Sequence, residues 1–168
     1  MSFDTQPTLS DGIILVRPLT ECDRGGVFAA AADPATWAGH PAHDRWQPEV
    51  FGPYFDTLCA GKAVAIEKDG AIIGVSRFYV PPDQPEDIAI GFTFLNRAHW
   101  GGSVNAAVKQ LMLDHAFARV ATVWFHIAPT NIRSQKATAK LGAVHRHDAV
   151  LDLSGTPTLW QCWSLPRP

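Results

Sequence analysis

The chain has 168 residues, of which 46% are hydrophobic and 18% charged, a composition typical of one globular domain with a proper core. Its formal net charge of −2 argues against a partner that a strongly basic surface would attract, such as nucleic acid or an anionic membrane. The cysteines Cys22, Cys59 and Cys162 form no close pair, so neither a disulfide framework nor a metal site is expected. No apolar run reaches membrane-spanning length and the first residues lack a signal-peptide core, which favours a cytoplasmic protein.

The first third of the chain is predicted to open with a loose terminus over residues 1–12 and a short strand over 13–17 that Pro18 ends. Thr20 is the predicted N-cap of a helix over 21–32. The irregular segment 33–47 carries Trp37, His40, His43 and Trp46. Because no further ligand stands at a supporting spacing, a solvated loop is favoured over a metal site. The aromatic residues suggest that the loop forms one wall of a substrate site.

The middle of the chain predicts a helix over 48–60 and then three strands. The first two, over 63–67 and 72–80, are joined by Asp69-Gly70, a strong hairpin signal. The third strand, over 88–95, alternates regularly. One of its faces is expected to carry Ile88, Ile90, Phe92 and Phe94.

The stretch after this strand turns through a glycine pair into a helix predicted over 104–120. The N–H groups at a helix start lack intrahelical partners, and together with the helix dipole they form a site for an anion such as phosphate. An ordinary strand-to-helix turn is the alternative. The remaining chain predicts a strand over 121–127, a short basic helix over 132–141 and an antiparallel pair over 143–153 and 159–165.

Two motifs within this order of elements resemble a known family. Ile90-Gly91-Phe92-Thr93-Phe94-Leu95 followed by Trp100-Gly101-Gly102-Ser103 is similar to the acetyl-CoA segment of the GCN5-related N-acetyltransferase (GNAT) superfamily. Asn131-Ile132-Arg133-Ser134, followed by Lys140-Leu141-Gly142-Ala143, resembles its second signature. Within that superfamily the chain most resembles the branch that contains the ribosomal-protein N-terminal acetyltransferases. The resemblance covers about residues 13–165 and implies a single α/β (α+β) domain, with a mixed, mostly antiparallel sheet of about six or seven strands and about four helices.

The resemblance also implies acetyl-CoA as co-substrate, with no metal, and a set of residues that bind it. The pantetheine arm is expected on the backbone of Phe92, Thr93, Phe94 and Leu95. The pyrophosphate is expected on the N–H groups of Trp100, Gly101, Gly102, Ser103, Val104 and Asn105. Further cofactor contacts are expected from Asn131, Arg133 and Ser134.

The sequence indicates the catalytic residues less clearly than the residues that bind the cofactor. Ala89 stands where many relatives carry a general-base Glu, so Glu86 and Asp87 just upstream are the candidate bases. Ser134 is the candidate acid toward the departing thiolate, with a plain capping role as the alternative. His99 and His126 could be acid–base groups, although structural roles are favoured for both.

Ser103 stands where the family usually has Gly or Ala, which suits the loop only if the φ angle there is not positive. The function that the resemblance implies is acetyl transfer to a primary amine, either a protein N-terminus or a small molecule, by an enzyme that could form a homodimer. An antibiotic-modifying acetyltransferase is one alternative. The other is a non-catalytic acyl-CoA-binding module, which the missing Glu favours.

Overall fold

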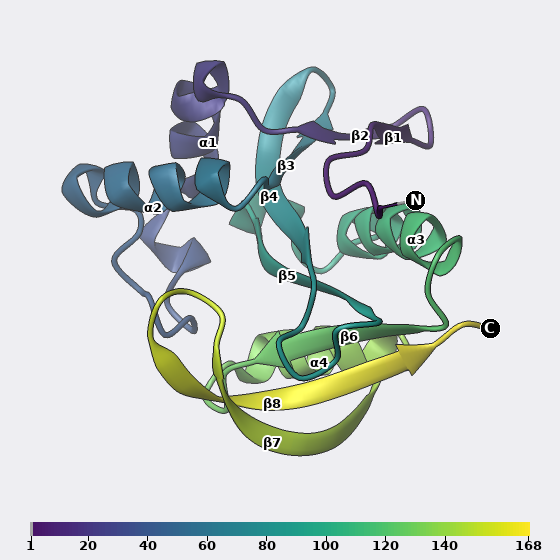
Figure 1. Cartoon of the computed structure of the whole chain (residues 1–168). Helices are drawn as coiled ribbons and strands as arrows, with labels where there is room; N and C mark the ends of the chain where they lie inside the picture. The colour runs from purple at the N-terminus through teal and green to yellow at the C-terminus, as the bar shows by residue number, and fades with distance from the viewer. Residues whose placement is uncertain (1) are drawn as a thin grey trace.

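The computed structural model describes residues 2–168, and one eight-stranded sheet runs through it in the order β1-β2-β3-β4-β5-β6-β8-β7 (Figure 1). Neighbouring strands are antiparallel except β5 and β6, which are parallel. The strands are β1 (Leu9–Ser10), β2 (Ile14–Pro18), β3 (Val64–Lys68), β4 (Ala71–Tyr79), β5 (Ile88–Leu95), β6 (Thr122–Ile127), β7 (Val144–Asp152) and β8 (Pro157–Pro166). The helices are α1 (Arg24–Ala31), α2 (Pro48–Ala60), α3 (Val104–Phe117) and α4 (Ile132–Lys140).

The predicted fold class is confirmed, with eight strands rather than six or seven. The difference arises partly at the N-terminus, where residues predicted as a loose segment form β1, with Leu9 opposite Val16 of β2. The third helix ends at Phe117, earlier than predicted. The helix predicted over 21–32 begins with a separate 3-10 turn, Glu21–Asp23, in which the Asp23 carboxylate accepts a hydrogen bond from the backbone N–H of Thr20 at 2.8 Å.

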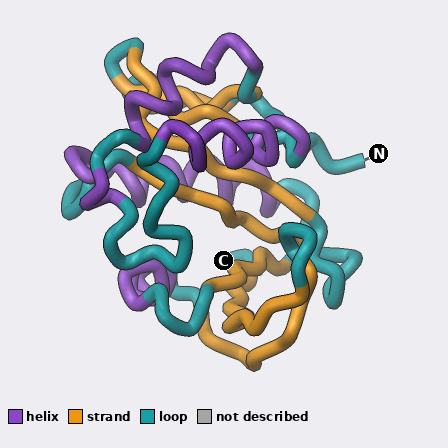
Figure 2. The backbone as a smooth tube through the Cα atoms, turned by 90° about the vertical axis from the view of Figure 1, so that its left-hand side faces the viewer, coloured by secondary structure: helices purple, strands orange, loops and turns teal. Residues whose placement is uncertain are grey.

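Helices cover both faces of the sheet. Residues of α3, such as Val108 and Met112, pack with Val16 and Phe125 in the larger core. Helices α1 and α2 pack in a second core on the opposite face. Strands β7 and β8 form the curled end of the sheet, which lies below most of the helices in Figure 2. Among residues 2–168, none of the helices combines the length and the apolar character needed to cross a membrane.

Strand β5 does not keep the predicted alternation. The register with β4 shifts so that Arg77 faces Gly91 whereas Val75 faces Phe94. Two residues of β5, Phe92 and Thr93, therefore lie opposite one residue of β4, which is a β-bulge. Phe92 adopts a φ of 54°. Because the extra residue reverses the alternation, Ile90 lies in the larger core and Phe94 in the second, on the other face of the sheet.

The segment 33–47 is less solvated than predicted. Trp37 is 1% exposed, and its indole N–H donates to the carbonyl of Ala31 at 2.9 Å. Its ring packs at 4.9 Å from that of Phe94. His40 is half-buried, and burial lowers its pKa to about 4, whereas His43 is exposed. The aromatic residues thus fix this loop against the end of β5 instead of leaving it free.

Candidate active site

Strands β5 and β6 separate after a short paired stretch. These parallel strands pair only at Ile88 with Val123 and at Ala89 with Trp124. Strand β5 nevertheless continues to Leu95, and β6 to Ile127. The edge of β5 on the β6 side therefore has no partner strand beyond Ala89. The Leu95 carbonyl accepts from the indole N–H of Trp100, and backbone groups there that have no such partner need hydrogen bonds from water or from a ligand. An extended molecule with amide groups is suited to that position, because it can pair as an added strand does.

Polar side chains form hydrogen bonds with Thr93 in the bulge at Phe92 and Thr93. Ser76 of β4 and Thr93 share a hydrogen bond of 2.7 Å between their hydroxyl oxygens. Lys109 of α3 donates from its ammonium group to Thr93 at 2.8 Å. Lys109 is buried, which lowers its pKa to about 8. Sequence analysis missed this lysine, whose only signal was a charge within a broadly apolar helix.

The segment around the pair Gly101-Gly102, the glycine loop, connects β5 to α3. Gly101 has a φ of 73°, in the left-handed region that favours glycine. A Cβ atom at Gly102 would meet no other atom within 4 Å. Ser103, with a φ of −83°, is the N-cap and needs no positive φ, so the serine suits this position. The first N–H groups of α3 therefore lie behind a small, open surface of the kind that binds an anion.

The structure brings the two sequence motifs together at this loop. The Arg133 guanidinium, in the first turn of α4, lies 3.8 Å from the centre of the Trp100 ring. The indole N–H of Trp100 in turn donates to the carbonyl of Leu95 at 2.9 Å. A positive charge from the second motif thus contacts Trp100, in the loop that leads into α3, which makes this corner more suitable for a phosphate group.

Asn131 has the capping role that its position predicts. Its side-chain oxygen accepts a hydrogen bond from the N–H of Ser134 at 3.3 Å. Ser134 is half-buried in the first turn of α4. The structure therefore places both residues near Arg133, on the side of the molecule where the glycine loop lies.

Asn131→Ala is expected to lower the free energy of unfolding by about 1 kcal/mol, because the N–H of Ser134 loses its acceptor. Urea denaturation followed by circular dichroism measures this difference. Asn131→Asp, which keeps a capping oxygen, is the matched control and should remain close to wild type. Equal stability of the Ala variant and wild type would show that the cap contributes nothing.

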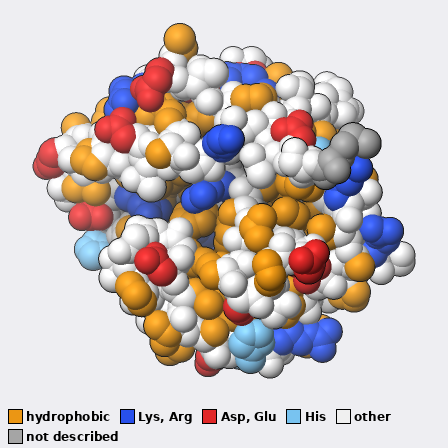
Figure 3. Space-filling model, viewed as in Figure 1, with side chains coloured by type: hydrophobic (Ala, Val, Ile, Leu, Met, Phe, Trp, Pro, Cys, Tyr) orange, Lys and Arg blue, Asp and Glu red, His pale blue; other side chains and the backbone are white. Residues whose placement is uncertain are grey.

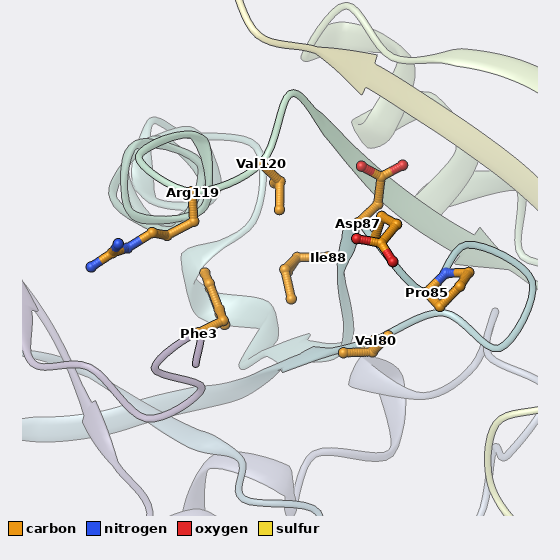
Figure 4. A pocket seen from close by; sticks show the side chains of 8 residues that line it. Phe3, Val80, Pro85, Asp87, Ile88, Arg119 and Val120 are labelled. Atoms are coloured by element: carbon orange, nitrogen blue, oxygen red, sulfur yellow. The ribbon is translucent and has the colours of Figure 1, made fainter. Parts of the chain in front are cut away.

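The two candidate bases lie at the other end of β5. Glu86 and Asp87 line a pocket of about 410 Å³ with residues of the N-terminus and of the segment after α3 (Figure 4). The Asp87 carboxylate accepts a hydrogen bond from the indole N–H of Trp124 at 2.9 Å. This is the end at which β5 and β6 are paired, and a strand of eight residues separates it from the glycine loop by roughly 20 Å. The structure does not bring these carboxylates together with the predicted cofactor residues.

A different acid–base pair lies where the strands separate. His126 is on β6 beyond the last residue that pairs with β5, and its Nδ1 lies 2.7 Å from the hydroxyl of Tyr79 on β4. His126 is 9% exposed, and its Nε2 is buried with no hydrogen-bond partner. Burial lowers the pKa of His126, so the imidazole is neutral at neutral pH. A buried polar atom without a partner is costly, and it is often explained by a ligand or water in the functional state.

The residues around this pair are aromatic and basic. The Phe92 ring at the bulge lies 5.4 Å from the Tyr79 ring. The Arg77 guanidinium lies 5.1 Å from the centre of the Phe92 ring, and its buried Nε has no hydrogen-bond partner. Figure 3 shows Lys and Arg side chains gathered around a hollow between α2 and the part of the sheet that holds β6 and β8. The bulge, the unpartnered imidazole and the edge of β5 thus belong to one region.

Comparison with known proteins identifies the class of this chain. Residues 14–144 match the family model described as the acetyltransferase (GNAT) domain. The chain belongs to the GNAT family, whose members are acetyl-CoA-dependent N-acetyltransferases. A search of curated proteins found no match.

Solved structures show the same fold. A GCN5-related N-acetyltransferase from Brucella melitensis has a TM-score of 0.77 at 15% identity, over 98% of this chain and 80% of that one. RimJ from Mycobacterium smegmatis, in complex with CoA-disulfide, has a TM-score of 0.68 at 18% identity, over 97% and 87%. Aminoglycoside acetyltransferase AAC(6′)-Ib, in complex with coenzyme A and kanamycin, has a TM-score of 0.65 at 15% identity, over 92% and 95%.

Proposed function

We propose that this chain transfers the acetyl group of acetyl-CoA to a primary amine. The observation that supports this most directly is the separation of β5 from β6. The unpaired part of β5 leads to the glycine loop and to the N-terminus of α3. An extended pantetheine arm would pair with the backbone of Phe92 to Leu95, and the pyrophosphate would rest on the N–H groups of Trp100 to Asn105. Arg133 and Asn131 would contact the same end of the cofactor.

The bulge would supply the electrostatic help that acyl transfer needs. Attack of the amine on the thioester carbonyl places negative charge on the carbonyl oxygen. A backbone N–H freed from the ladder at Phe92 or Thr93 would stabilise that charge at a fixed position. Lys109 and Ser76 would act as positioning residues, since they hold Thr93 and therefore the bulge.

His126 is our candidate for the base that takes the proton of the amine, in preference to Glu86 or Asp87. In the tautomer whose Nδ1–H donates to the Tyr79 oxygen, Nε2 keeps a lone pair that no group of the described chain uses. A neutral imidazole in that state can take a proton from the ammonium form of the acceptor, and the neutral amine that results can attack the thioester. Ala89, buried beside Trp124, has no side chain that could do so.

Ser134 remains the candidate that returns a proton to the CoA thiolate. Ser134→Ala should then reduce turnover more than it weakens acetyl-CoA binding, since the backbone contacts of the cofactor are unchanged. Steady-state kinetics and calorimetry on the same preparation separate the two effects. Equal losses in kcat and in affinity would instead make Ser134 a cofactor contact.

The acceptor is proposed as a primary amine on either a protein N-terminus or a small molecule. RimJ and AAC(6′)-Ib share the fold, and the latter was solved with kanamycin, an aminoglycoside. These likenesses support both acceptor types without choosing one. The non-catalytic alternative is opposed by His126, which offers a base where Ala89 removes the usual one.

The function is tested in two stages. Calorimetry with acetyl-CoA should give a 1:1 heat signal, and the melting temperature should rise with cofactor concentration because only the folded state binds. CoA release is then measured with N-terminal peptides, polyamines, amino acid derivatives and aminoglycosides. Absence of binding at millimolar acetyl-CoA would overturn the proposal, and binding without CoA release from any amine would favour an acyl-CoA-binding module.

A further inference from the structure

Three side chains from three different elements meet at the curled end of the sheet. Asp83 lies in the turn between β4 and β5, His147 on β7 and Cys162 on β8. One ligand atom from each, a carboxylate oxygen, an imidazole nitrogen and the thiol sulfur, all lie within 4.8 Å of one another. His147 and Cys162 are opposite each other in the antiparallel ladder, next to an irregularity in the register between His145 and His147.

We propose that Asp83, His147 and Cys162 bind one divalent transition-metal ion of the Zn²⁺ type. This site adjoins the proposed base, since His126 lies opposite Cys162 in the ladder between β6 and β8, but the metal proposal does not rest on the acetyl-transfer function. Sequence analysis predicted no metal site, because the three residues are far apart in the chain and show no ligand spacing.

The distance between Asp83 and His147 fits two ligands of one ion better than a direct hydrogen bond. The carboxylate of Asp83 lies 3.6 Å from Nε2 of His147. That exceeds the usual range of an N–H···O hydrogen bond. Two ligands of a tetrahedral Zn²⁺ ion, with metal–ligand bonds of roughly 2.0–2.2 Å, lie roughly 3.3–3.5 Å apart. A small adjustment of the exposed Asp83 would therefore let both residues share an ion.

The donor set selects the class of metal. A thiolate and an imidazole are borderline or soft ligands, and they favour Zn²⁺ and its neighbours over Mg²⁺ or Ca²⁺, which prefer oxygen. Three protein ligands leave one tetrahedral position for water, as in open zinc sites. The burial agrees with this, because Cys162 is buried whereas Asp83 and His147 are exposed and can face solvent.

Neighbouring residues hold the ligands in position. The Trp124 ring lies 6.0 Å from the His147 ring and at a steep angle to it, which restricts the imidazole. Burial raises the pKa of the Cys162 thiol to about 11, so the thiol is protonated in the metal-free protein. Metal binding would form a sulfur–metal bond and release the thiol proton to solvent, with no change in oxidation state.

Cobalt is the probe that reports on the sulfur ligand directly. The chelator-treated full chain is titrated with Co²⁺, and its absorption spectrum is recorded. We expect one equivalent to bind, with a thiolate-to-cobalt charge-transfer band in the near ultraviolet and the intense visible bands of four-coordinate Co²⁺. Zn²⁺ should displace the cobalt and remove both sets of bands.

Variants separate this site from other cysteines and histidines. Cys162→Ser should abolish the charge-transfer band, and Asp83→Asn and His147→Gln should each weaken Co²⁺ binding about 10-fold or more. Cys59→Ser is the matched cysteine control. His145→Gln is the histidine control, since His145 pairs with Asp148 at 2.7 Å instead. Both controls should bind as wild type does.

The result that overturns the proposal is equally specific. Wild type without a thiolate band at millimolar Co²⁺, or a band that survives in Cys162→Ser, means that these residues do not bind the metal. Far-UV circular dichroism checks the fold of the Cys162 variant. If that variant does not fold, the two variants at the exposed residues Asp83 and His147 decide, and unchanged Co²⁺ affinity in both overturns the proposal.

Discussion

Gly102→Val is expected to abolish acetyl-CoA binding while leaving the fold intact. A Cβ atom at Gly102 meets no other atom within 4 Å, and the backbone there is not in the left-handed region. The valine should therefore be accommodated by the protein, yet its side chain would stand on the open surface before the first turn of α3. That is where the proposed pyrophosphate must approach the N–H groups.

Calorimetry and the thermal shift with acetyl-CoA measure this effect. Gly25→Val is the matched control, since Gly25 is an exposed position of α1 at which an added Cβ also meets nothing. Gly101→Val is a useful contrast, because its φ of 73° would strain a valine and cost about 1–3 kcal/mol of stability as well. If Gly102→Val binds acetyl-CoA as tightly as wild type, the loop is only a turn and the cofactor lies elsewhere.

His126→Gln is expected to reduce kcat by about 10²–10⁴-fold, the usual contribution of a general base. Glutamine is similar in size and can still donate an amide N–H to the Tyr79 oxygen, but it cannot take up a proton near neutral pH. Acetyl-CoA binding should be unchanged, because His126 is not among the proposed cofactor contacts. A loss of affinity equal to the loss of kcat would argue against a catalytic role for His126.

The pH profile gives a second, independent signature. The base must be neutral, so activity is present above the folded-state pKa of His126 and lost as pH falls through it. Burial lowers that pKa in the free enzyme below the ordinary value of 6.5, so the acid limb of kcat/KM should lie below pH 6.5. The limb should be absent from the residual activity of His126→Gln. His99→Gln is the control and should keep the wild-type profile, since His99 lies in the 3-10 turn before the glycine loop.

The sequence predicted the elements well because local physics determines them. The Asp69-Gly70 turn predicts a hairpin, and both residues adopt the positive φ angles, 54° and 76°, that a tight hairpin turn requires. Pro48 begins α2 and the helix ends at Ala60, as predicted. These features depend on residues within one turn of each other, so no knowledge of distant contacts is needed.

The sequence predicted only part of the candidate site. The glycine loop and the cap at Asn131 are visible in the sequence, because each is a short motif with its own chemistry. The contact between Trp100 and Arg133 joins segments more than thirty residues apart and appears only in the folded chain. The candidate bases Glu86 and Asp87 were chosen by closeness in sequence to Ala89, and the strand direction carries them to the end of β5 remote from the glycine loop.

By itself, the sequence determined the order of the elements, the family resemblance and the glycine loop proposed to bind an anion, all of which follow from periodicity and from residue types at short spacing. Only the tertiary structure decided where β5 bulges, how far it pairs with β6, and which side chains face each other across strands. His126 with Tyr79, and Asp83 with His147 and Cys162, are such groupings. They depend on strand register and sheet curvature, which are set by packing over the whole domain and leave no local signal in the chain.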